Sequence, residues 1–285
     1  MMKKIRLTIF TFIFSFSLFI NADIKNTTFA FWDQPDVELN YILPQSVDED
    51  TKILFVIHGN SRNAEDYLKL WERLVMDKNL IVIAPKFDKN NFGNFNTLQT
   101  STSSGRILRN KEKYLNKSIS FFFNFFKTKF NLKTDNYMMY GHSAGAQFIH
   151  RYMMLSDDYR ISNVVIANAG WYTFINNNKY PYGISGTPIE ITKQRIDWFL
   201  SRDITLLIGE DDKGNISLNN SKGALEQGLN RNIRAKNYFS NLTKYSEKNK
   251  IPFRWRYKEI KGVSHENKKM TIIASNIILD NLDKT

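Results

Sequence analysis

The stretch Tyr140-Gly141-His142-Ser143-Ala144-Gly145 decides the fold, because it marks a sharp change from strand to helix. Residues 136–140 end an apolar run that predicts a buried strand, and residues 144–155 have the character of a helix. Between them, the pattern Gly-x-Ser-x-Gly is typical of a nucleophilic serine held on a tight strand-to-helix turn. Glycine suits both flanking positions, because strand and helix approach closely there and leave no room for a Cβ atom.

A five-residue pattern of this kind also occurs by chance in unrelated proteins, so its context decides its meaning. Strand, turn and helix follow here in the order that the chemistry requires. We therefore predict that Ser143 is a nucleophile. The alternative is an ordinary turn between a strand and a helix.

The N-terminus has the pattern of an export signal. Three positive side chains within the first six residues precede an uncharged apolar run from Leu7 to Ile20, and Ala22 offers a small residue for cleavage. The run is shorter than the roughly 20 residues of a membrane span. We expect residues 1–22 to be a signal peptide and residues 23–285 to be one periplasmic or secreted domain without a stable membrane anchor. The alternative is an anchor that is not cleaved.

The composition fits one globular domain: of 285 residues, 42% are hydrophobic and 24% are charged. The absence of cysteine excludes disulfides and a lipid-modified cysteine. The net charge of +12 falls to +9 without the three positive side chains of the signal. Because the lysines are scattered and no nucleic-acid motif is present, we expect no nucleic-acid partner. Binding to an anionic envelope polymer is the alternative for this charge.

Apolar runs alternate with helical segments along the rest of the chain, which predicts an α/β fold with a mostly parallel sheet and helices on both faces. An antiparallel edge strand is expected within residues 28–44, and residues 90–109 are expected to form a long surface loop. After the strand that ends at Ala169, an aromatic and Asn-rich stretch to about Gly186 predicts a small excursion from the sheet.

Polar clusters follow four of the predicted strands directly, at His58-Gly59-Asn60, residues 141–145, residues 209–212 and His265. In open parallel sheets, sites collect at the carboxyl ends of the strands. This coincidence favours an enzyme.

A serine hydroxyl needs a base, and histidine is the usual one because its pKa lies near neutral. Of the four histidines, His142 lies inside the turn, His150 lies on the following helix and His58 follows an early strand. Only His265 follows a late strand in a loop before the last helix. We predict that it is the general base; the alternative is an ordinary exposed histidine.

The residue that orients this base must lie between Ser143 and His265 at the end of a strand. Asp211 and Asp212 both qualify, with Glu210 a weaker candidate. The spacing from Gly209 favours Asp212. Asp211 stays the open alternative.

An oxyanion needs two N–H donors. We predict the amide of Ala144, directly after the nucleophile, and the amide of Asn60; a simple turn at His58-Gly59 is the alternative. No metal site is expected, because the histidines lack ligand spacing and cysteine is absent. No cofactor is expected, because no glycine-rich phosphate loop is present.

Together these motifs resemble the α/β-hydrolase fold and, more narrowly, bacterial esterases similar to polyhydroxybutyrate depolymerases and feruloyl esterases. The resemblance extends over residues 50 to 282 and includes the stretches His58-Gly59-Asn60-Ser61-Arg62-Asn63, Asn168-Ala169-Gly170-Trp171-Tyr172, Tyr180-Pro181-Tyr182-Gly183 and Gly262-Val263-Ser264-His265-Glu266-Asn267. It implies hydrolysis of a carboxylic ester through an acyl-enzyme on Ser143.

The chain departs from extracellular depolymerases of that kind, which carry cysteines near the oxyanion loop and often a polymer-binding domain. A small-molecule or soluble ester is therefore the expected substrate. Trp171 and Tyr172 are candidates for substrate binding, and packing onto the sheet is the equal alternative. The functional alternatives are a serine peptidase of the same fold and a non-catalytic basic protein that binds the envelope. The oligomeric state is not determined by the sequence.

Overall fold

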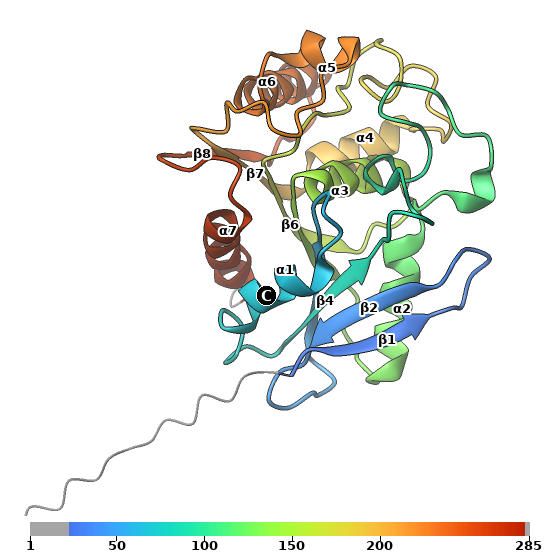
Figure 1. Ribbon diagram of the computed structural model, residues 1–285, viewed down its shortest axis with the longest axis vertical. Helices are drawn as coiled ribbons and strands as arrows, with labels where there is room; N and C mark the ends of the chain where they lie inside the picture. The colour runs from blue at the N-terminus through green and yellow to red at the C-terminus, as the bar shows by residue number, and fades with distance from the viewer. Residues whose placement is uncertain (1–22, 283–285) are drawn as a thin grey trace, which may run out of the picture.

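A central sheet of eight strands organises the part of the chain that the computed structural model describes, residues 23–282 (Figure 1). The predicted signal peptide lies outside the described residues. The strand order is β1-β2-β4-β3-β5-β6-β7-β8, in which β1–β2 and β2–β4 are antiparallel and the other neighbours are parallel. The strands are β1 (Lys25–Phe29), β2 (Val37–Ile42), β3 (Lys52–Ile57), β4 (Leu80–Lys86), β5 (Tyr137–His142), β6 (Ile161–Ala167), β7 (Asp203–Gly209) and β8 (Arg256–Ile260). The predicted mostly parallel α/β architecture is confirmed.

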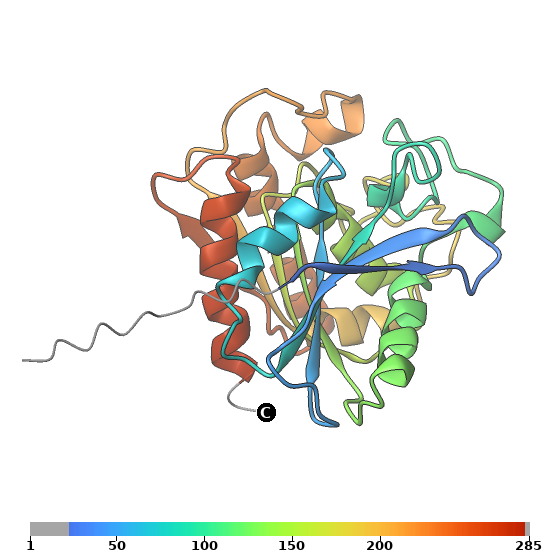
Figure 2. The ribbon, with the colours of Figure 1, turned by 60° about the horizontal axis from the view of Figure 1, so that its bottom comes forward.

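Helices cover both faces of this sheet (Figures 1 and 2). Helices α1 and α7 lie side by side on one face, and α2, α3, α4 and α6 pack on the other. The helices are α1 (Ala64–Glu72), α2 (Ser118–Lys129), α3 (Ala144–Leu155), α4 (Lys193–Leu200), α5 (Lys222–Gln227), α6 (Arg231–Asn249) and α7 (Asn267–Leu282). The short helix α5 was not expected from the sequence. No helix within residues 23–282 is long and apolar enough to cross a bilayer.

Strand β3 shows why the centre of the sheet is stable. Ile53, Phe55 and Ile57 join the core under one face, whereas Leu54 and Val56 join the core under the other. All five are fully buried. The unbroken apolar run of this segment is therefore the pattern of a strand that is covered on both sides.

The N-terminal edge differs from the prediction of one strand within residues 28–44. The chain forms two antiparallel strands, β1 and β2, with Phe29 paired with Val37. Between them the indole Nε1 of Trp32 donates a hydrogen bond to the Pro35 carbonyl, 3.1 Å away, which closes the turn. Apolar alternation did not reveal this reversal, because β1 is polar apart from Phe29 and only β2 alternates.

Strand β4 includes Pro85, although proline has no N–H to donate to a neighbouring strand. Its pairing with the parallel neighbour β3 is complete by Ile83, so the missing N–H of Pro85 removes no hydrogen bond on that side. Pro85 lies opposite Leu39 of β2 instead.

Residues 90–109 were expected to be a surface loop, but much of this segment is buried. Phe92, Phe95 and Leu98 belong to the main core, and a short 3₁₀ helix (Phe95–Thr97) lies within the segment. The guanidinium of Arg62 donates hydrogen bonds to the carbonyls of Phe87, Phe92 and Gly93. Long-range contacts therefore order a stretch that has no periodicity of its own.

The topology places the predicted nucleophile at a switch point of the sheet. Strand β3 pairs with β4 on one side and with β5 on the other, so the direction in which successive strands are added reverses at this point. Such switch points in parallel sheets are where ligands bind. The turn after β5 and the turn after β3 meet here.

Candidate active site

Ser143 stands on a strained turn between β5 and α3. Its backbone lies at φ 57° and ψ −117°, a conformation that non-glycine residues rarely adopt. Its N–H donates a hydrogen bond to the carbonyl of Ala167, at 2.9 Å. A Cβ atom on Gly145 would lie 2.0 Å from the carbonyl oxygen of Ile57, so this position accepts only glycine. The close approach of helix α3 to β3 thus holds the serine at the carboxyl edge of the sheet.

The structure brings three predicted side chains into one hydrogen-bonded row. The Oγ of Ser143 lies 2.9 Å from Nε2 of His265, and Nδ1 of His265 lies 2.8 Å from Oδ2 of Asp212. With the proton on Nδ1, the imidazole donates to the carboxylate and Nε2 accepts from the serine hydroxyl. Asp212 is buried, whereas 30% of the His265 side chain is exposed. This arrangement allows the imidazole to take the serine proton while the carboxylate orients the ring.

The loops that carry Asp212 and His265 are joined directly. The N–H of Asp211 donates to the carbonyl of Val263, and the N–H of Asp212 donates back to the carbonyl of Gly209. A Cβ atom on Gly209 would lie 2.2 Å from the Val263 carbonyl oxygen. This crossing turns the Asp212 carboxylate toward His265, whereas Asp211 is exposed to solvent.

Asn168 connects the same two loops through its side chain. Its backbone is left-handed, at φ 50°, directly after β6. The side-chain amide donates to the carbonyl of Ser264 and accepts from the N–H of Gly209, both at 2.9 Å. Sequence reasoning assigned no role to this residue. An asparagine at a strand end is a weak signal, because it is also common in turns.

The two predicted oxyanion donors belong to the two turns that meet at Ser143. Ala144 is the first residue of α3, so its N–H has no carbonyl partner within the helix. Asn60 is exposed in the turn after β3, and the adjacent Gly59 lies so close to Ser143 that a Cβ atom on Gly59 would be 3.8 Å from the Cβ of Ser143. The roles of both amides stay predictions.

Comparison with solved structures gives two strong likenesses. Poly(aspartic acid) hydrolase-1 from Sphingomonas sp. KT-1 superposes with a TM-score of 0.83 at 29% identity, over 91% of this chain and 100% of the other. The poly(3-hydroxybutyrate) depolymerase LpqC from Bordetella parapertussis gives 0.82 at 24% identity, over 91% and 90%. A ferulic acid esterase is more distant, with a TM-score of 0.57 at 15% identity over 90% and 96%.

The chain therefore has the α/β-hydrolase fold. The predicted resemblance to bacterial esterases is confirmed by these likenesses. No family model matches the sequence, and no curated protein matches it. The identification therefore depends on the tertiary structure.

Asp212 has a second partner that sequence reasoning missed. The Nη1 of Arg231 lies 3.2 Å from Oδ1 of Asp212, and both side chains are buried. Arg231 is the first residue of α6, a polar helix whose sequence contains several arginines and lysines. No local signal distinguishes Arg231 from these neighbours, because only the docking of the helix directs it to the carboxylate.

The other three histidines of the α/β-hydrolase domain are buried and uncharged. Burial lowers the pKa of His58 to about 4, and it also lowers the pKa values of His142 and His150. His58 accepts from the N–H of Phe87, and His150 accepts from the N–H of Thr173, each through Nε2. Both rings therefore accept hydrogen bonds from backbone N–H groups.

His142 has a different environment. Its Nδ1 lies 3.2 Å from the hydroxyl of Tyr67, and its ring centroid lies 4.8 Å from that of His265. Burial and the neighbouring His265 both lower its pKa. His142 is thus an uncharged ring against which the His265 ring packs.

The two candidate substrate-binding aromatics are buried. Tyr172 stacks on Tyr238, with ring centroids 4.3 Å apart, inside the main core. Trp171 lies between the guanidinium of Arg151, 3.9 Å from its ring centre, and the ring of Tyr182. These contacts favour the packing alternative, and contact with substrate stays a prediction.

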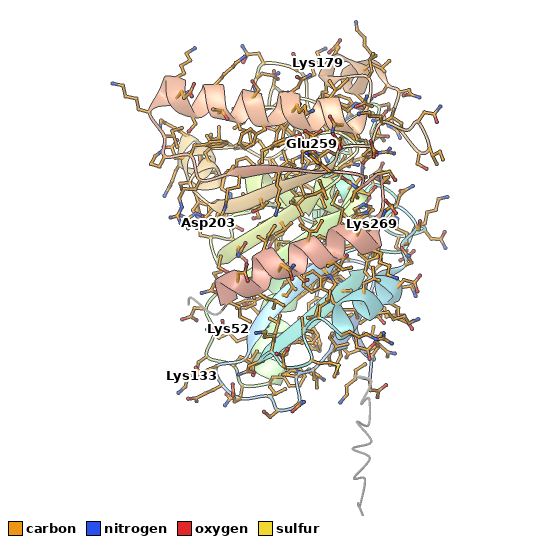
Figure 3. The ribbon with its side chains drawn as sticks, turned by 90° about the vertical axis from the view of Figure 1, so that its left-hand side faces the viewer. Lys52, Lys133, Lys179, Asp203, Glu259 and Lys269 are labelled. Atoms are coloured by element: carbon orange, nitrogen blue, oxygen red, sulfur yellow. The ribbon has the colours of Figure 1, made fainter. Side chains whose placement is uncertain are left out.

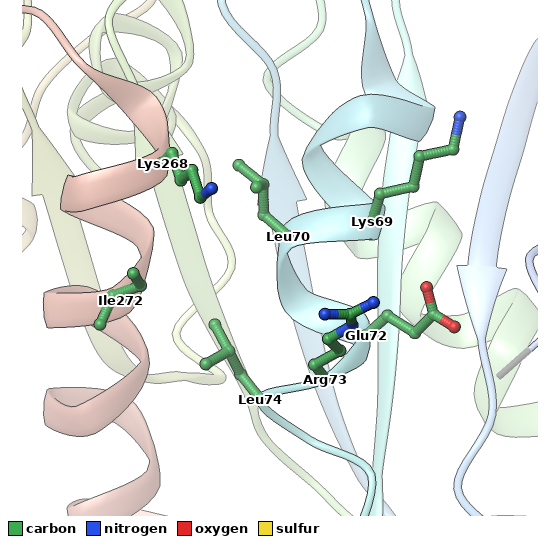
Figure 4. Close-up of a pocket in the computed structure, with 7 residues that line it drawn as sticks. All are labelled: Lys69, Leu70, Glu72, Arg73, Leu74, Lys268 and Ile272. Carbon is green, nitrogen blue, oxygen red and sulfur yellow. The ribbon is translucent and has the colours of Figure 1, made fainter. Parts of the chain in front are cut away.

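A hollow of about 400 Å³ opens between α1 and α7 (Figure 4). It contains none of the residues of the row. Its lining mixes charged and aliphatic side chains: Lys69, Leu70, Glu72, Arg73, Leu74, Lys268 and Ile272.

Proposed function

We propose that the protein is an exported serine hydrolase that cleaves carboxylic esters through an acyl-enzyme on Ser143. The observation that carries this proposal is the unbroken row of hydrogen bonds from Ser143 through His265 to Asp212. The esterases among the structural neighbours support the ester as substrate. Export is proposed from the N-terminal sequence alone.

The proposed reaction has two halves. Ser143 Oγ attacks the ester carbonyl carbon while Nε2 of His265 takes the hydroxyl proton, and the amides of Ala144 and Asn60 bind the oxyanion. Collapse of this intermediate breaks the bond to the alcohol, which leaves with the proton from His265. Water then attacks the acyl-enzyme by the same route, which releases the acid and restores Ser143.

A covalent probe tests the proposal. We expect a fluorophosphonate to label the wild-type protein at Ser143 and short-chain nitrophenyl esters to be hydrolysed. Ser143→Ala should fold normally, with an unchanged melting temperature, and lose both labelling and turnover. A wild-type protein that neither reacts with the probe nor cleaves any ester in a panel would refute the proposal.

Amide hydrolysis is a second candidate, because one structural neighbour is named a hydrolase of poly(aspartic acid). That polymer is held together by amide bonds and carries a carboxylate on each unit, and the present chain is strongly basic. Poly(aspartic acid) and peptides should be assayed beside the esters. A higher kcat/KM for an amide than for any ester would assign the site to this second reaction.

The non-catalytic alternative, an envelope-binding protein, is less favoured by the charge distribution. Figure 3 shows acidic and basic side chains together on one side of the molecule. Lys133 pairs with Glu49, Lys269 pairs with Glu266, and Glu259 pairs with Lys236. These local pairs interrupt the basic surface that such binding would use.

A further inference from the structure

We propose that Arg231 is a positioning residue for the proposed catalytic row, in which it holds the Asp212 carboxylate in the orientation that binds His265. This inference rests on the proposed function, because positioning has a kinetic consequence only if the row catalyses a reaction.

The two carboxylate oxygens of Asp212 have different partners. Oδ2 accepts from Nδ1 of His265 at 2.8 Å, and Oδ1 accepts from Nη1 of Arg231 at 3.2 Å. The side chain of Asp212 is 1% exposed and that of Arg231 is 3% exposed, so water solvates neither charge well. A buried carboxylate is costly unless it is both paired and hydrogen-bonded. Arg231 meets this need without competing for the oxygen that His265 uses.

The planar guanidinium also fixes the segment after the acid. Nη2 of Arg231 donates to the carbonyl of Ile216 at 2.7 Å, and Nη1 lies 3.4 Å from the carbonyl of Gly214. One side chain therefore links Asp212 to the backbone that follows it. Lysine would keep the charge but could not reproduce this fork.

The start of helix α6 places Arg231 at this point. Asn230 caps the helix by accepting from the N–H of Ile233, and the N–H of Asn232 donates to the backbone carbonyl of Asp212. The side chain of Asn232 also donates to the carbonyl of Gly209. Several independent hydrogen bonds therefore hold the first turn of α6 against the loop that carries Asp212.

Arg234, three residues later on the same helix, is a natural control. It is fully buried and donates to the carbonyls of Gly170, Gly228 and Asn219 at 2.8 to 2.9 Å. It forms no ion pair with a carboxylate among the described residues. Both arginines thus lie on the same helix, are buried and donate to backbone carbonyls. Arg231 contacts Asp212, whereas Arg234 does not.

The test compares Arg231→Gln and Arg231→Lys with Arg234→Gln and Arg234→Lys. For each full-length protein, kcat and KM for a nitrophenyl ester, the rate of fluorophosphonate labelling and the melting temperature are measured. A misdirected catalytic group can cost about 100-fold in rate. We expect Arg231→Gln to lose about this factor in kcat, with KM nearly unchanged. Arg231→Lys should recover about tenfold of it, because a positive charge beside the Asp212 carboxylate is restored.

Both Arg234 variants should lower the melting temperature and leave kcat of the folded protein unchanged. Equal losses of kcat in Arg231→Lys and Arg231→Gln would overturn the inference. Equal losses in the Arg231 and Arg234 variants would also overturn it. In either case the guanidinium of Arg231 would only hold the backbone in place. A wild-type kcat in Arg231→Gln would overturn it too.

If Arg231→Gln does not fold, the lysine variants decide. A kcat about tenfold below wild type in Arg231→Lys, with Arg234→Lys unchanged, supports positioning; equal kcat values overturn it. Failure of the proposed function is distinguishable, because the wild-type protein itself would then show neither labelling nor turnover.

Discussion

The carboxyl edge of the sheet and the aromatic layer beneath β1 and β2 are stabilised in different ways. At the edge, directed hydrogen bonds hold Ser143, His265 and Asp212. In the aromatic layer, Phe122 of α2 packs edge-on against Phe29 and Trp32, with ring centroids 5.0 and 5.4 Å apart. The first region fixes the direction of individual atoms, whereas the second buries apolar area with little directional demand. We therefore expect substitutions at the edge to change turnover and substitutions in the layer to change stability.

The largest effect should come from Asp212→Asn. An amide cannot hold the imidazole in the required tautomer or stabilise the imidazolium, and in a serine protease the equivalent change lowers kcat about 10⁴-fold. Asp211→Asn is the matched control, since its carboxylate is exposed and should be dispensable. Steady-state kinetics on the same ester measure both. Similar losses in the two variants would mean that the adjacent carboxylates share the role.

Phe122→Ala should show the opposite behaviour. Removing a fully buried ring leaves a cavity and should lower the free energy of unfolding by about 3–5 kcal/mol. Phe121→Ala is the control, because 39% of Phe121 is exposed and its loss should cost below about 1 kcal/mol. Urea unfolding measures both variants. A large fall in kcat of folded Phe122→Ala would break the comparison between the two regions.

The smallest effect, taken per residue and per pH unit, comes from the buried histidines. Their pKa values are lowered in the folded state, to about 4 for His58, while an unfolded histidine titrates near its ordinary pKa of 6.5. Below pH 6.5 the unfolded chain therefore binds protons that the folded chain does not. The free energy of unfolding should fall by about 1.4 kcal/mol per pH unit for each such histidine, and the term from His58 should level off near pH 4.

Urea unfolding at several pH values between 7 and 5 measures this dependence. A stability that stays constant over this range would show that the three rings take up protons without unfolding.

Much of the fold follows from local sequence. The apolar run Lys52–Ile57 matches β3, and the predicted helix after the serine matches α3, residues Ala144–Leu155. Both segments have clear boundaries, because the first is an unbroken apolar run and the second begins directly after the glycine-flanked serine. The hairpin of β1 and β2 and the burial within residues 90–109 were not predicted. The first arm of the hairpin has a single apolar residue, Phe29, and the buried segment depends on Arg62, a distant residue.

The candidate site divides in the same way. Ser143 and His265 stand out locally, one by its flanking glycines and the other by its place between a late strand and the last helix. The contact of Asp212 rather than Asp211 with His265 depends on the crossing of two loops at Gly209 and Val263. Sequence spacing favoured Asp212 but left Asp211 open.

By itself, the sequence determined the alternation of strands and helices and the glycine-flanked serine, because period and steric room are properties of neighbouring residues. Only the tertiary structure decided which carboxylate meets the imidazole and that Arg231 and Asn168 support it. The reason is physical: the direction of a side chain at a loop is set by the segments that pack against that loop, and these come from distant parts of the chain.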